Sequence, residues 1–199
     1  IHAIAGVHVG PVPEGEAHLS AFKTFGPPVI DLMGPMPFVV ANSMMDPTFI
    51  SGSRNYWKSH FLNELTDDAI VAIVAAFTRK PTPRSAFALR HMGGAIAHVR
   101  PEDTAFPARS APYLVSIDGQ WTDAAHDADN IAWVREYRKA NAPFTTGGVY
   151  LNFIGDEGEA RIKAAFGEDK YERLAQVKSE YDPRNVFAGN QNIRPTVPA

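Results

Sequence analysis

The sequence has no cysteine among its 199 residues. This absence excludes disulfide bridges, thiolate metal sites and cysteine nucleophiles, and it fits a reducing compartment, so we expect a cytoplasmic protein. Long hydrophobic runs are also missing, since no apolar stretch approaches the roughly 20 residues that a membrane-spanning helix needs. The sequence therefore predicts no membrane partner.

Neither sign of charge is in large excess. The chain carries 19 lysines and arginines against 22 aspartates and glutamates, a formal net charge of −3, and the basic residues are scattered. A nucleic-acid partner favours a basic stripe or patch, so we predict no such partner and expect small-molecule chemistry. Hydrophobic residues make up 45% of the chain, which is enough for the core of a globular domain.

The seven histidines form no metal motif. Neither His2 with His8 nor His91 with His98 has the helical i, i+4 spacing of a zinc helix, and no pattern places a third ligand. We therefore predict no metal site. The pair Gly93-Gly94 lacks the lysine and the strand-loop-helix order of a phosphate-binding loop, so it indicates a tight bend.

Short segments rich in β-branched and aromatic residues are interspersed with amphipathic segments, without a regular βαβ repeat. This pattern predicts an α+β fold, with a largely antiparallel sheet flanked by helices on one face. The expected strands are 2–9, 54–61, 85–91, 94–99, 112–119 and 147–154. The expected helices are 14–25, 67–79, which Thr66 is placed to cap, 127–140, and 168–181, which Pro183 ends.

The clearest functional pattern lies between Gly148 and Pro195. Side chains alternate along a strand, so Tyr150 and Asn152 are expected to share one face while Val149, Leu151 and Phe153 take the other. A helix then ends in Tyr181, Asp182, Pro183, Asn185 and Phe187, and a polar tail follows with Asn190, Gln191 and Ile193.

This order of motifs resembles the C-terminal segment of the berberine-bridge-enzyme-like branch of FAD-linked oxidases, within the vanillyl-alcohol-oxidase-type flavoproteins. The resemblance covers nearly the whole chain, because segments 26–38, 55–62, 93–99 and 104–109 follow the family's order and approximate spacing. It implies FAD as cofactor and a small-molecule substrate. It also implies an FAD-binding domain as partner, on the same polypeptide or on a second chain, since the family's Gly-rich pyrophosphate-binding loop does not occur in this sequence.

The resemblance also predicts the domain organisation. Residues 1–155 are expected to form a substrate-binding domain, truncated at its N-terminus because the chain opens on Ile1 without an initiator methionine or a leader. Residues 156–199 are expected to form a C-terminal helical arm that returns to pack on the FAD domain. About 45 residues are too few for a separate core, so the arm depends on that partner.

Tyr150 is the first candidate for catalysis. In relatives that oxidise sugars, the tyrosine of this motif takes the hydroxyl proton while hydride leaves carbon for the flavin. A phenol is a poor base at neutral pH unless positive charge or hydrogen bonds stabilise its phenolate, so the alternative is a tyrosine that only lines the pocket or contacts the flavin.

Three carboxamides are predicted flavin contacts, because a carboxamide offers both a donor and an acceptor: Asn152, Asn190 and Gln191. The alternative for Asn152 is a bond to a nearby loop. The alternative for the two tail residues is exposure to water.

Ser116 and Asp118 are expected to share a face of the strand 112–119. Some plant relatives carry a Glu or Gln base near this place, and counting back from Trp121 aligns it with Ser116, a predicted substrate contact. Asp118 is then the second candidate base, with a solvated edge carboxylate as the alternative.

Lys58 is a predicted contact for a phenolate or an anionic substrate, and the alternative is a lysine that only caps the surface of the sheet. Arg109 is expected to brace its loop.

Two functions from different classes fit these observations. The first is the substrate-binding and C-terminal portion of an FAD-dependent oxidoreductase, which oxidises an alcohol, a sugar or a similar small molecule by hydride transfer and is inactive without its flavin domain. The second is a flavin-free small-molecule binding module built on the same α+β sheet. The presence of bound flavin in the purified protein distinguishes the two functions.

Overall fold

The computed structural model describes residues 2–153, 155, 158–189 and 191–196. The chain forms two compact units, Ile1–Ile50 and Ser51–Ala199. The first unit contains helix α1 (Val12–Thr24), helix α2 (Phe38–Ser43) and a 3-10 turn (Asp46–Thr48). The predicted boundary at residue 155 concerns the complete protein and stays a prediction.

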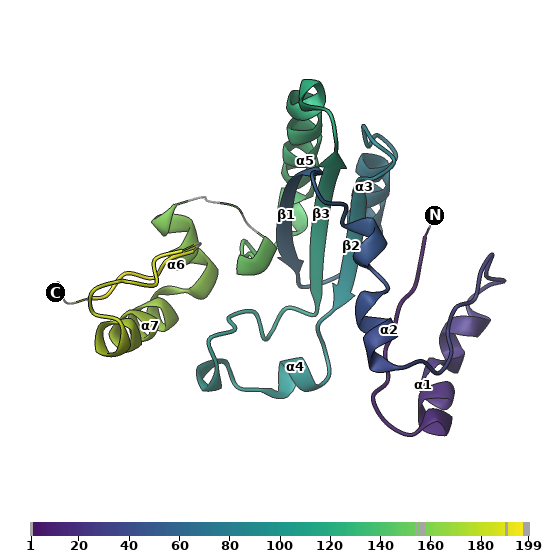
Figure 1. Ribbon diagram of the computed structural model, residues 1–199, viewed down its shortest axis with the longest axis horizontal. Coiled ribbons are helices and arrows are strands. Elements are labelled where there is room, and N and C mark those ends of the chain that lie inside the picture. Colours follow the sequence, from purple (N-terminus) through teal and green to yellow (C-terminus); the bar gives the residue numbers. More distant parts are fainter. Residues whose placement is uncertain (1, 154, 156–157, 190, 197–199) are drawn as a thin grey trace. The chain divides into compact units, whose positions relative to one another are not determined.

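The second unit is built on an antiparallel sheet of three strands in the order β1-β3-β2 (Figure 1). The strands are β1 (Arg54–Leu62), β3 (Tyr113–Trp121) and β2 (Ala86–His91). They confirm three of the expected strands. Because β3 is central, its Ser116 lies opposite Ser59 of β1 on one side and Ala88 of β2 on the other.

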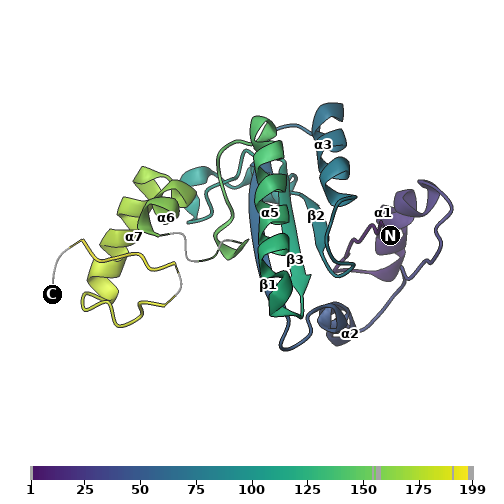
Figure 2. The same cartoon turned by 90° about the horizontal axis from the view of Figure 1, so that it is seen from above.

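Helices α3 (Asp67–Phe77) and α5 (Asp127–Asn141) cover one face of this sheet, which we call the helix face (Figure 2). The core between them is apolar and consists of Leu62, Ile73, Ala76, Val115, Ile117, Trp133, Val134 and Tyr137. Full burial of one large aliphatic side chain contributes about 1.5–3 kcal/mol, so this layer is the main source of stability for the unit. The arrangement confirms the predicted α+β class with helices on one face.

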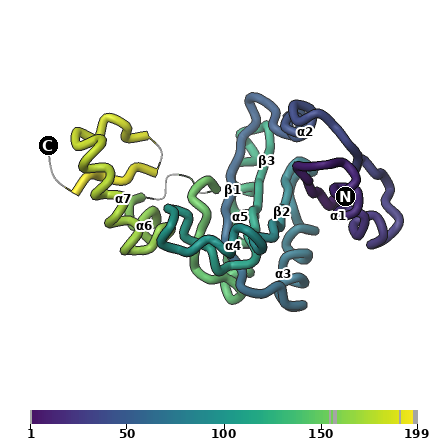
Figure 3. Tube along the Cα trace, turned by 90° about the horizontal axis from the view of Figure 1, so that it is seen from below, coloured from purple at the N-terminus to yellow at the C-terminus, as the bar shows by residue number. Residues whose placement is uncertain are grey.

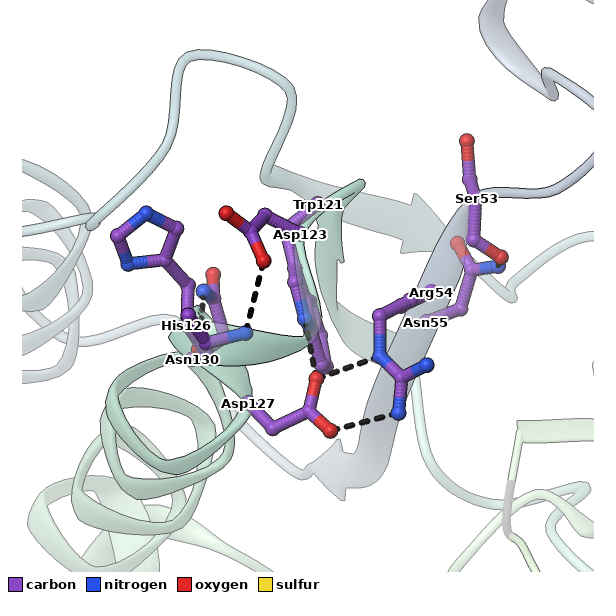
Figure 4. A network of polar contacts seen from close by, with 9 residues as sticks. Ser53, Arg54, Asn55, Trp121, Asp123, His126, Asp127 and Asn130 are labelled. Atoms are coloured by element: carbon purple, nitrogen blue, oxygen red, sulfur yellow. Dashed lines mark hydrogen bonds and ion pairs between the residues drawn. The ribbon is translucent and has the colours of Figure 1, made fainter.

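Polar contacts fix both helices in place. The side chain of Thr66 accepts a hydrogen bond from the Ala69 backbone N–H, which confirms the predicted cap of α3. Asp127, in the first turn of α5, accepts two bonds from the Arg54 guanidinium and one of 2.7 Å from Trp121 Nε1 (Figure 4). One carboxylate therefore ties α5 to both β1 and β3.

The predicted strands at 2–9 and 94–99 are wrong. Residues 2–9 form no strand, and alternating hydrophobicity does not by itself supply the neighbour whose backbone a strand must pair with. At 94–99, Gly94 has a φ of +61° and begins the short helix α4 (Ala95–His98). Glycine reaches this left-handed conformation without the steric cost that a Cβ atom adds.

The C-terminal part contains helix α6 (Glu159–Phe166), helix α7 (Glu168–Tyr181) and a tail that folds back on α7 (Figure 3). The observed bounds of α7 match the expected helix 168–181. Asp182 ends it by accepting backbone bonds from Val186 and Phe187 and by pairing with Lys178, which lowers the pKa of that carboxyl. The Asp-Pro-x-Asn motif is thus a helix-terminating turn.

Candidate functional site

Tyr150 lies beside the edge of β1. The chain approaches this edge through a single bridge between Thr145 and Leu62, and the Tyr150 backbone N–H then donates to Ser59 Oγ at 3.2 Å. Between these contacts Gly147 has a φ of +83°, which turns the chain away from regular pairing. The predicted strand at 147–154 is therefore wrong over the described residues, and Leu151–Phe153 form a 3-10 turn instead.

This turn brings Asn152 to the phenol of Tyr150. The carboxamide nitrogen of Asn152 donates to the phenolic oxygen at 2.9 Å. The phenolic oxygen thus accepts a hydrogen bond from a neutral amide donor. The two residues are neighbours as expected, although a tight turn, and not strand alternation, places them together.

Aromatic rings enclose the Tyr150 ring. Phe153 meets it edge-on at a centroid distance of 5.1 Å and Phe106 at 5.9 Å. Strand alternation assigned Phe153 to the face opposite Tyr150, and this assignment is wrong, because both pack against the same cluster around Phe61 and Leu114. The enclosure restricts the ring and leaves its hydroxyl at a polar margin with the exposed Asn152.

Arg109 positions one of these rings. Its guanidinium donates to the Ile96 carbonyl at 3.0 Å and to Thr104 Oγ1 at 2.7 Å, and it lies 4.9 Å from the centre of the Phe106 ring. The expected bracing of this loop is present, and its consequence is to hold Phe106 against Tyr150.

Ser116 and Asp118 share the sheet face opposite to α3 and α5, which we call the loop face. Ser116 is fully buried and its hydroxyl lies 3.4 Å from Asp118 Oδ2. Burial raises the pKa of Asp118, while the Arg90 charge and the Ser116 hydroxyl oppose that rise. The alternative of a solvated edge carboxylate is wrong, because β3 is the central strand and Asp118 is half-buried.

Arg90 is the residue that sequence reasoning missed. Its Nη1 donates to Ser116 Oγ at 3.0 Å, and its guanidinium lies 4.8 Å from the centre of the Phe153 ring. Arg90 thus links the Ser116 and Asp118 pair to the aromatic enclosure of Tyr150. Alternation along β2 identifies its face, but only the pairing register shows which residues of β3 it meets.

The remaining predicted residues lie elsewhere. Lys58 points to the helix face, where its ammonium lies 5.2 Å from the centre of the Tyr56 ring, so the structure does not bring it to Tyr150. Gln191 is half-buried in the tail that bonds to α7, and Asn190 lies outside the described residues. The roles assigned to these three residues stay predictions.

The residues around the Tyr150 ring have the chemistry to hold the edge of a flavin. A planar heteroaromatic ring needs flat apolar contacts and amide-like hydrogen-bond partners. Phe106 and Phe153 offer the flat apolar contacts, and Asn152 offers a carbonyl oxygen with no partner among the described residues.

Among all residues that the structure describes, no group of three or more His, Cys, Asp or Glu side chains could hold a metal ion. No helix in this described part is long and apolar enough to cross a membrane.

Comparison with known proteins gives a consistent result. Residues 149–194 match the family described as berberine and berberine like. The chain is 27% identical to an FAD-linked oxidoreductase of Dictyostelium discoideum and 28% identical to an uncharacterized FAD-linked oxidoreductase of Bacillus subtilis. Each match covers 96% of this chain, and the chain spans 42% of the length of each relative.

Among solved structures, CrmK, a flavoenzyme of caerulomycin biosynthesis, is similar in fold. The superposition has a TM-score of 0.65 at 27% identity and covers 80% of this chain and 37% of CrmK.

Proposed function

We propose that this chain, which belongs to the berberine-bridge-enzyme-like family of FAD-linked oxidoreductases, is the substrate-binding and C-terminal part of an enzyme that oxidises an alcohol, a sugar or a similar small molecule. Its partner is an FAD-binding domain, on the same polypeptide or on a second chain. The relatives are more than twice as long as the chain, which supports this view.

The observation that carries the proposal is the hydrogen bond from Asn152 to the Tyr150 phenol, inside an aromatic enclosure. Oxidation of a carbinol requires a base for the hydroxyl proton. We assign this task to Tyr150, and the assignment is supported by the amide donor at its oxygen and by the packed rings of Phe106 and Phe153, which hold the phenol in one orientation.

FAD, when bound, supplies the acceptor for the hydride. The chain's own residues bind and orient the alcohol and take its proton at Tyr150 Oη. The rings of Phe106 and Phe153 limit the access of water to this oxygen. Asn152 also offers its free carbonyl oxygen to the cofactor edge. Arg90 and Ser116 orient Asp118, the second group able to accept a proton on this face.

The test is the variant Tyr150→Phe in the flavin-loaded full protein. It removes the phenolic oxygen and keeps the ring, so flavin content should match the parent while substrate reduces the flavin at least about 100-fold more slowly. The matched variant Tyr113→Phe, on the helix face, should reduce at the parent rate. If Tyr150→Phe reduces at the parent rate, Tyr150 is not the base, and a parent protein that carries no flavin favours the binding module.

A further inference from the structure

Helix α7 contacts the loop that joins β2 to β3. In the first turn of α7, the Lys170 ammonium donates to the backbone carbonyls of Pro101 and, at 2.8 Å, of Thr104. On the next turn, Arg173 Nη1 donates to the Glu102 carbonyl at 3.1 Å. The partners of these bonds are 66 to 71 residues apart in the sequence. Three bonds from side chains to backbone therefore connect the C-terminal part to this loop.

The loop attracts these cations because it begins with a negatively charged turn. Glu102 and Asp103 lie in a 3-10 turn, and Arg100 pairs with both carboxylates, at 3.4 and 2.8 Å. One arginine does not balance two carboxylates, so the turn favours Lys170 and Arg173 as neighbours. The hydrogen bond from Arg100 lowers the pKa of Asp103, and the Lys170 charge acts in the same direction.

The same loop carries Phe106, which packs on Tyr150. Thr104 joins the two contacts, because its carbonyl accepts from Lys170 and its hydroxyl accepts from Arg109 at 2.7 Å. The Arg109 guanidinium lies 4.9 Å from the centre of the Phe106 ring. That ring meets the Tyr150 ring edge-on at a centroid distance of 5.9 Å. A continuous set of contacts thus leads from α7 to the candidate base.

We propose that Lys170 is a positioning residue for the Tyr150 phenol and acts through Phe106. Lys170 holds the loop, the loop keeps the Phe106 ring against Tyr150, and the packed ring keeps the phenolic oxygen in the orientation that proton transfer needs. A displacement of about 1 Å at a reacting group slows a reaction by up to about 100-fold, so a contact outside the site is able to affect the rate. The inference rests on the proposed function, in which Tyr150 Oη takes the proton of the alcohol.

Removal of the Lys170 ammonium should loosen the loop without unfolding the protein. Lys170 is not part of the apolar core between the sheet and helices α3 and α5, and its bonds lie at an exposed surface. Such bonds open locally at a lower free energy than the core does. Lys170→Met keeps a side chain of similar length and removes both bonds, whereas Lys170→Arg keeps a donor.

Lys80 provides a matched control. Its ammonium also donates to two backbone carbonyls, those of Pro83 at 3.1 Å and of Ser85 at 2.9 Å. The loop that it holds precedes β2 and does not carry Phe106. Lys80→Met therefore removes the same kind of contact and leaves the Tyr150 enclosure as it is.

The first experiment needs neither a substrate nor flavin reduction. The full protein is labelled with para-fluorophenylalanine at position 106, and the fluorine NMR resonance reports the surroundings of that ring. In Lys170→Met the resonance should move toward its position in the urea-unfolded protein, because the ring loses its contact with Tyr150. In Lys170→Arg and in Lys80→Met it should stay at the parent position.

The second experiment measures the rate of flavin reduction by the same alcohol that tests Tyr150→Phe. Lys170→Met should slow the reaction at least about fivefold. In the Phe106→Ala background, which has no ring to hold, the same change should slow it by less than about twofold. Lys80→Met should react at the parent rate. A merely structural role of Lys170 would slow both backgrounds equally.

The proposal is overturned if the fluorine resonance of Lys170→Met stays at the parent position, if this variant reacts at the parent rate, or if both backgrounds slow equally. A parent rate in Tyr150→Phe is a different result. It refutes the proposed function, and with it the catalytic purpose of Lys170, whereas a moved fluorine resonance would still establish that Lys170 holds Phe106.

Discussion

The two faces of the sheet use the same residue type for different chemistry. On the loop face, the Tyr150 phenol receives an amide hydrogen bond from Asn152, and the nearby cation, Arg90, is bonded to Ser116 next to a carboxylate. On the helix face, the Tyr56 phenol lies among lysine and arginine side chains. The loop face, where Arg90 lies close to a carboxylate, suits proton exchange with an uncharged alcohol, whereas the Tyr56 phenol lies beside two cationic side chains.

Acid should separate the two faces most strongly through His60. Its folded pKa of about 4 lies below its ordinary value of 6.5, so the unfolded chain takes up the proton first as pH falls. The free energy of unfolding should therefore decrease by about 3 kcal/mol between pH 7 and pH 4 on account of this one group. Urea unfolding of the parent and of His60→Gln at both pH values measures it, and an equal decrease in both proteins would contradict the assignment.

Asp118 should respond in the opposite direction and by less. Burial raises its folded pKa above the ordinary 3.8, so ionisation costs the folded state stability as pH rises through the window above 3.8. Asp118→Asn should remove this cost, so the free energy of unfolding should increase more between pH 4 and pH 7 in the variant than in the parent. A smaller increase in the variant would show that the carboxylate is favourably paired in the folded state.

Removing one arginine from each face should show that the faces act separately. Arg90→Met removes the charge that opposes the raised pKa of Asp118, so that pKa should rise further. If Asp118 shares in proton transfer, the acid limb of the rate of flavin reduction moves to higher pH in this variant. Burial and the Arg138 charge lower the pKa of His60, so Arg138→Met should raise the pKa of His60 while the acid limb stays where it is in the parent. A shift of the acid limb in Arg138→Met would contradict the separation of the two faces.

Local patterns in the sequence predict the elements that are determined by local interactions. The apolar stripe and the Thr66 cap define α3, and Pro183 with Asp182 ends α7. The fold class follows from the same patterns. The segment around Tyr150 differs, because its conformation depends on a left-handed Gly147 and on a bond to Ser59, which is 91 residues away in the sequence.

The candidate site shows the same division. Ser116 and Asp118 could be paired from alternation along a single strand. Arg90 could not be added, because the register between β2 and β3 is set by tertiary packing. Sequence patterns could not predict the cationic side chains around Tyr56 either, because they come from β1 and from α5, more than 70 residues later in the sequence.

The most direct test of the central claim, that Asn152 acts through the Tyr150 phenol, is a double-mutant cycle on the rate of flavin reduction in the full protein. We expect Asn152→Ala alone to slow the reaction about tenfold, the scale of one hydrogen bond to a charged oxygen. In the Tyr150→Phe background, which has no phenol to stabilise, the same change should slow it by less than about twofold. An equal tenfold loss in both backgrounds would contradict the account, because Asn152 would then act on the cofactor or the substrate independently of Tyr150.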